Sequence, residues 1–144
     1  MVTISLKFRL SASGTGTCFS LRVDGQTVWQ GDPGSADHLI EYNNLSDTDG
    51  ERHLIEFVLE DKTFDHTTLD EQGNIVSDLL VSISNIAIED VDLDKTIHKI
   101  AHYHHNFNGT GVQTDSKFFG VLGCNGVATF EFTSPFYLWV LENL

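Results

Sequence analysis

Residues 21–29 read Leu-Arg-Val-Asp-Gly-Gln-Thr-Val-Trp, so two short apolar runs flank an Asp24-Gly25 pair. Asp-Gly between alternating apolar residues is the strongest short-range signal of a hairpin closed by a two-residue turn. The same alternation precedes this stretch, where apolar residues from Ile4 to Leu10 occupy every second position. It returns in residues 53–59 and 128–132. A period of two residues is typical of strands with one buried side.

Patterns of this kind fill most of the chain, with turn residues about every 8–12 positions and no convincing helix. We therefore predict an all-β protein, an antiparallel β-sandwich or jelly roll, in a single domain over residues 1–144. The alternating apolar sets predict the following core residues: Phe8, Leu21, Phe57, Ile83, Phe130 and Leu138.

Three stretches need a more local interpretation. The apolar phase slips by one residue near Glu89-Asp90, which predicts a β-bulge or a bend. Asn125-Gly126 is a second hairpin signal between two short apolar segments. Residues 136–141 are apolar on both sides, which predicts a central strand covered on both faces, with residues 142–144 at a contact surface.

The charge balance excludes two classes of partner. The 144 residues contain 8 Lys and Arg against 21 Asp and Glu, a formal net charge of −13 at pH 7. Contacts to phosphate need clustered Lys and Arg, so we expect no nucleic-acid binding and no attachment to an anionic membrane surface. The alternating N-terminus lacks the continuous apolar segment of a signal peptide, and no run approaches the roughly 20 residues of a membrane span.

The stretch from Asp61 to Asp78 is long, acidic and poor in apolar residues. Its carboxylates, with Asp70 among them, are hard oxygen ligands of the kind that calcium takes six to eight at a time. The spacing is not that of an EF-hand loop. Two interpretations remain open, a calcium site and a solvated loop that supplies solubility.

A second polar group lies near the histidines. His102 and His104 project from one side of an expected strand and His105 from the other. Two imidazoles on one face can bind zinc or copper, although a closed site needs further ligands, and the alternative is an ordinary surface pair. Cys18 and Cys124 fit no metal-binding spacing; they are either buried thiols or, in an oxidising compartment, a disulfide.

No motif of nucleophilic catalysis is present, and we expect no enzymatic activity. Among the aromatic residues, Trp29 beside a Gly-Asp-Pro-Gly loop is the candidate to stack on a sugar ring, with core packing as the alternative. Trp139 is expected in the core.

Two stretches together resemble a known family. Residues 21–29, followed by the acidic run from Leu59 through Asp70-Glu71-Gln72-Gly73-Asn74 to Leu93, are similar to the calcium-dependent xylan-binding type of carbohydrate-binding module. The resemblance implies a small jelly-roll β-sandwich in which a loop-bound calcium contacts sugar hydroxyls. It implies calcium held around Asp61, Asp70 and Asp78, with an aromatic such as Trp29 stacking on the glycan.

The end of the chain carries a second resemblance. Asn106-Phe107-Asn108-Gly109 and residues 134–144 look like the ends of virion structural proteins of tailed bacteriophages, especially those of marine cyanobacteria. This implies a non-catalytic virion protein that assembles in the host cytoplasm. Its expected partners are other virion proteins, a second copy of the chain, or a cell-surface or polysaccharide glycan. The alternative is a capsid decoration or tail protein that binds no ligand.

Overall fold

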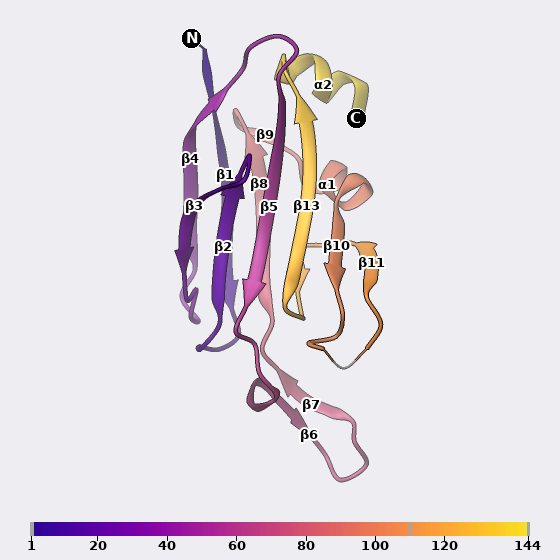
Figure 1. Ribbon diagram of the computed structural model, residues 1–144. Helices are drawn as coiled ribbons and strands as arrows, with labels where there is room; N and C mark the ends of the chain where they lie inside the picture. Colours follow the sequence, from indigo (N-terminus) through magenta and orange to yellow (C-terminus); the bar gives the residue numbers. More distant parts are fainter. Residues whose placement is uncertain (1, 110, 144) are drawn as a thin grey trace.

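The computed structural model describes residues 2–109 and 111–143 as two antiparallel sheets that face each other across an apolar core (Figure 1). One sheet has the strand order β11 (Thr114–Lys117), β10 (His102–His105), β13 (Gly126–Thr133), β5 (Arg52–Glu60), β2 (Cys18–Val23) and β3 (Gln26–Gly31). The other has the order β12 (Val121–Leu122), β8 (Val81–Ile88), β1 (Thr3–Ala12) and β4 (His38–Ser46), with β9 (Val91–Asp92) paired to β8.

A separate two-stranded hairpin projects from one end of the sandwich (Figure 1). It consists of β6 (Thr67–Leu69) and β7 (Ile75–Asp78), and a short 3-10 helix, Phe64–His66, precedes it. The hairpin lies within the acidic stretch that the sequence indicates as a long loop. An isolated two-stranded hairpin is only marginally stable in water, so this element depends on its anchorage at the base.

The prediction of an all-β sandwich is confirmed, and so is most of the predicted core. Phe8, Leu21 and Phe57 are fully buried, and Ile83 and Phe130 are 3% exposed. The ring of Phe57 lies at the centre, 5.1 Å from that of Phe8 in the opposite sheet and 6.1 Å from that of Phe130. The Asp24-Gly25 turn joins β2 to β3 as predicted; both residues have positive φ, 51° and 84°, which glycine adopts without steric cost.

The prediction of a central strand over residues 136–141 is wrong. Residues 136–143 form helix α2 (Phe136–Asn143), which lies at the end of the sandwich opposite the projecting hairpin (Figure 1). Phe136, Trp139 and Val140 are buried, at the i, i+3, i+4 spacing of one helical face. Leu138 is 54% exposed, so its predicted place in the core is also wrong. An apolar run of this length is compatible with either element, and here the helical packing prevails.

A second helix, α1 (Asp94–Ile100), also corrects the expectation that the chain has no helix. Ile97 is fully buried, and the Asp94 carboxylate accepts the amides of Asn85 and Ile86 at 3.1 and 2.8 Å, which ties the helix to β8. Seven residues are too few to show a helical period in the sequence.

The structure decides two turn predictions. Of the two alternatives at Glu89-Asp90, a β-bulge or a bend, the structure has the bend: these residues form a two-residue turn between β8 and β9, because Ile88 pairs with Val91. The Asn125-Gly126 signal does not close a hairpin, since β12 pairs with β8 and β13 with β10 and β5.

The two cysteines are free thiols, Cys18 on β2 and Cys124 before β13. Within the described residues, no helix is long and apolar enough to cross a membrane.

Candidate functional site

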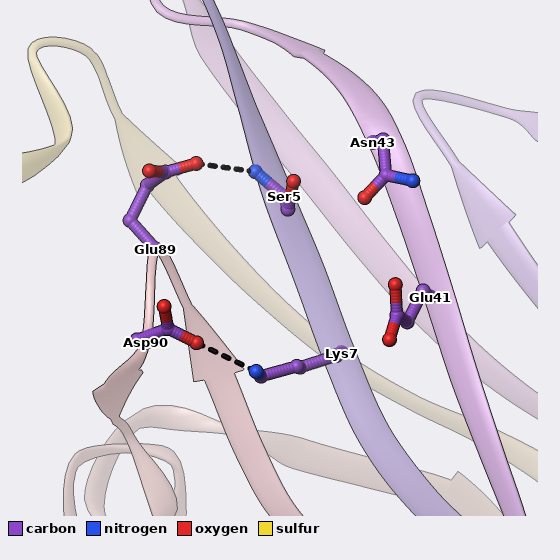
Figure 2. A pocket seen from close by; sticks show the side chains of 6 residues that line it. All are labelled: Ser5, Lys7, Glu41, Asn43, Glu89 and Asp90. Atoms are coloured by element: carbon purple, nitrogen blue, oxygen red, sulfur yellow. Dashed lines mark hydrogen bonds and ion pairs between the residues drawn. The ribbon is translucent and has the colours of Figure 1, made fainter.

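A polar pocket of about 190 Å³ lies on the outer face of the five-stranded sheet (Figure 2). It spans three neighbouring segments, the strands β1 and β4 and the turn between β8 and β9. Its lining residues are Ser5, Lys7, Glu41, Asn43, Glu89 and Asp90.

The alternation of β1 explains why polar side chains gather here. Leu6 and Phe8 point into the core, so Ser5 and Lys7 point outward. Lys7 pairs with Glu41 across the β1–β4 ladder, so both side chains are on this face, although the ammonium itself reaches away from Glu41 toward Asp90. The pocket is thus the solvent side of a half-buried sheet.

Glu89 shapes the rim of the pocket. The β1–β4 register shifts between Ile4 and Leu6, and at this irregularity the Ser5 amide donates to the Glu89 carboxylate at 2.8 Å. The Glu89 amide in turn donates to the Ser5 carbonyl at 3.0 Å. Glu89 and Asp90 have positive φ of 50° and 61°, a conformation that costs a non-glycine residue about 1–3 kcal/mol and is kept only where surrounding contacts impose it. Both bonds to Ser5 supply such contacts.

Lys7 is the only cation among the lining residues. Its Nζ lies 2.6 Å from an Asp90 carboxylate oxygen, and Figure 2 shows the side chain reaching from β1 toward the turn. The hydrogen bond to Asp90 and the charge of Asp90 raise the pKa of Lys7, with a smaller contribution from Glu41. The ammonium therefore stays protonated at neutral pH, and Asp90 occupies one of its three donor hydrogens.

The polar surface continues beyond this pocket. A second hollow is lined by Lys7, Asn85, Ile86, Ala87, Asp90 and Asp92, and a third by Lys7, Arg9, Leu39 and Asn85. Lys7 lies where all three meet. The face therefore offers ammonium and amide donors next to carboxylate and amide acceptors, a set that matches the hydroxyl groups of a sugar.

Sequence reasoning did not single out Lys7, Glu41 or Asn43. A usable signal was present, since Lys7 and Arg9 are two of only eight basic residues and share the outward side of one strand. What the sequence could not show is that β4 and the β8–β9 turn lie on either side of β1.

The predicted calcium ligands lie elsewhere, on and around the projecting hairpin. The Asp70 carboxylate accepts the amides of Gln72 and Asn74 at 3.0 and 2.8 Å inside the hairpin turn, and these hydrogen bonds lower its pKa. Asp61 is an exposed residue with φ of 67° that follows β5.

Asp78, the third predicted ligand, is engaged in an ion pair at the hairpin base. Its carboxylate lies 2.7 Å from Lys62 Nζ and accepts the Thr67 hydroxyl at 2.7 Å. The Lys62 side chain is 1% exposed and also donates to the Gly123 carbonyl. Burial raises the pKa of Asp78, but the hydrogen bonds from Lys62 and Thr67 and the charge of Lys62 outweigh it, so the pKa is lowered.

These three carboxylates therefore do not fit a shared calcium ion. Releasing Asp78 to a metal would leave a buried ammonium without its counter-charge, and one oxygen of Asp70, Oδ1, accepts the two amides that close its own turn. As the side chains stand, no group of three or more His, Cys, Asp or Glu within residues 2–109 and 111–143 is placed to hold a metal ion. Calcium at Asp61, Asp70 and Asp78 stays a prediction of the sequence, without support from their geometry.

Trp29, the predicted sugar-stacking residue, is only partly exposed. It lies on the edge strand β3 and packs against the core, its ring 5.9 Å from Phe19 and 6.4 Å from His38. It is not among the residues that line the pockets around Lys7. A stacking role for Trp29 stays a prediction.

Comparisons with known proteins define the class of fold. No protein-family model matches the chain, and no curated protein matches it. Two solved structures of vCBM60 share its fold. One is the selenomethionine form, described with two families of calcium-dependent carbohydrate-binding modules. It has a TM-score of 0.54 at 14% sequence identity, and the match covers 88% of this chain and 89% of the vCBM60 chain. The other is the complex of vCBM60 with galactobiose. It has a TM-score of 0.50 at 16% sequence identity, and the match covers 88% of this chain and 96% of the vCBM60 chain. The chain thus has the sandwich fold of these modules.

Proposed function

We propose that the chain is a non-catalytic module that binds a glycan on the outer face of its five-stranded sheet. The observation that carries the proposal is the pocket around Lys7, where the ammonium is paired with Asp90 and the side chains of Glu41 and Asn43 complete a polar lining. The likeness of the fold to vCBM60, one structure of which holds galactobiose, supports the same class of ligand.

The pocket residues have complementary tasks in this proposal. Lys7 donates its remaining hydrogens to hydroxyl oxygens, Glu41 accepts from hydroxyl groups, and the Asn43 amide does both. Glu89 holds the turn against β1 rather than contacting the ligand. Since no aromatic residue lines the pocket, we expect binding that depends on hydrogen bonds and has a favourable enthalpy.

Calorimetry tests the proposal. We expect heat of binding from at least one neutral oligosaccharide in a panel that includes galactobiose and xylo-oligosaccharides, and loss of that heat in Lys7→Met. The matched control is Lys95→Met, which removes an exposed lysine from α1 and should bind as the unmodified chain does. A panel without any binding, or unchanged binding by Lys7→Met, would contradict the proposal and favour a structural protein without a ligand.

A place in a phage particle, with other virion proteins or a second copy as partners, rests on the resemblance of the chain end alone. Of the predicted contact surface at residues 142–144, Leu144 lies outside the described residues. The exposed side chains of Tyr137, Leu138 and Leu141 on α2 are compatible with a contact there.

A further inference from the structure

His102 and His104 lie on one exposed face of β10, and the structure adds a carboxylate between them that the sequence did not reveal. Asp115 on β11 is the direct cross-strand partner of His104 and is diagonal to His102. The two imidazole side chains are 60% and 45% exposed, and that of Asp115 is 54% exposed. None of these residues belongs to the pockets around Lys7.

Two of the three separations that a shared metal ion requires, those from Asp115 to each imidazole, are already short. One Asp115 oxygen lies 3.2 Å from His102 Nδ1 and 3.8 Å from His104 Nδ1. Two ligands bonded to one zinc ion at about 2.1 Å and at tetrahedral angles are separated by roughly 3.4 Å, which these two values bracket.

We propose that His102, His104 and Asp115 form a binding site for a divalent transition metal of the zinc, copper or nickel class. Two imidazoles and one carboxylate suit these ions, whereas calcium and magnesium prefer oxygen ligands alone. Three protein ligands leave further coordination positions open to water or to an external group.

The site closes only when a metal binds. The two rings are now stacked at 23° with centres 6.4 Å apart, so the side chains as they stand do not enclose an ion. Both imidazoles are exposed enough to rotate toward Asp115, which costs side-chain entropy and the stacking of the two rings on each other. Lys117, opposite His102 on the same face, opposes a cation and limits the affinity. A metal ion bonds an imidazole only through a nitrogen lone pair, so the ligating nitrogen atoms must carry no proton in the complex.

Titration of the intact chain with Zn²⁺, followed by calorimetry without any sugar present, tests this site separately from glycan binding. We expect one binding event per chain at pH 7.5, lost in His102→Ala and in His104→Ala, weakened in Asp115→Asn, and unchanged in His98→Ala, whose imidazole lies in α1. With Cu²⁺, the electron paramagnetic resonance spectrum should show ligation by two nitrogens that falls to one in either histidine variant. No binding of Zn²⁺ at millimolar concentration, or binding that survives His102→Ala, would overturn the proposal.

Discussion

His53 shows how a single residue couples this fold to pH. It is 5% exposed on β5, with Nδ1 2.6 Å from the Asp24 carboxylate and Nε2 2.7 Å from the Ser46 carbonyl. Ser46 offers a carbonyl and ionised Asp24 a carboxylate, both acceptors, so the two hydrogen bonds form together when the imidazole carries a proton on both nitrogens. Burial lowers the pKa of His53, but the bonds to Asp24 and Ser46 and the charges of Asp24 and Glu51 raise it above its ordinary value.

The raised pKa of His53 predicts that its contribution to stability is complete at acidic pH, below the unfolded value of about 6.5, and is lost as pH rises through the folded value. Urea unfolding from pH 5.5 to 8.5, compared between the unmodified chain and His53→Gln, measures this. The difference in unfolding free energy should shrink as pH rises. A difference that grows with pH would show that the imidazole is neutral in the folded state.

The pKa of Asp78 is shifted in the opposite direction to that of His53, so its contribution to stability has the opposite pH dependence. Its lowered pKa means that its contribution is present at neutral pH and is lost as pH falls through the folded value. Asp78→Ala leaves the buried Lys62 ammonium unpaired, so we expect a loss of about 3 kcal/mol in unfolding free energy. The double variant Lys62→Met/Asp78→Leu should recover much of it. A loss below about 0.5 kcal/mol in Asp78→Ala would mean that Lys62 is solvated in the protein.

Helix α2 is the element where sequence and structure differ most, and two neighbouring residues distinguish the alternatives. Trp139 is 7% exposed against Phe132 and Phe136, whereas Leu138 is 54% exposed. We expect Trp139→Ala to cost about 3–5 kcal/mol and Leu138→Ala less than about 0.5 kcal/mol, measured by chemical denaturation. Comparable losses at both positions would instead indicate a strand covered on both faces.

The strands were predictable because their inward positions alternate, as in β1 and β5, and because Asp24-Gly25 encodes its turn locally. The helices were not, because α1 is too short to show its period and α2 is apolar on every side in the sequence. The pocket around Lys7 was out of reach for another reason. It depends on which strands become neighbours, and pairing between distant segments leaves no local pattern.

The calcium prediction concerns the β6–β7 hairpin and its base, and melting temperatures test it. Since Asp78 is paired with Lys62 and Asp70 closes its own turn, we expect the same melting temperature in EDTA and in millimolar calcium. A bound ion at a hundred-fold excess over its dissociation constant would add about 2.7 kcal/mol. An upward shift with calcium that disappears in Asp70→Ala would restore the metal site implied by the resemblance.

At the scale of the whole molecule, the two faces of the sandwich differ in chemistry. The outer face of the five-stranded sheet holds the pocket around Lys7, with its mixed donors and acceptors. The far edge of the six-stranded sheet carries His102, His104 and Asp115. Two proposed sites on separate sheets allow each to be removed without disturbing the other.

The proposed function depends on where a glycan contacts the chain. Amide chemical-shift mapping by NMR, during titration with an oligosaccharide that gives heat in calorimetry, measures this directly. We predict that the largest shifts fall on Ser5, Lys7, Glu41, Asn43 and the Glu89-Asp90 turn, and that they vanish in Lys7→Met. Shifts confined to the β6–β7 hairpin or to the surroundings of Trp29, with the pocket unchanged, would contradict glycan binding at the pocket around Lys7.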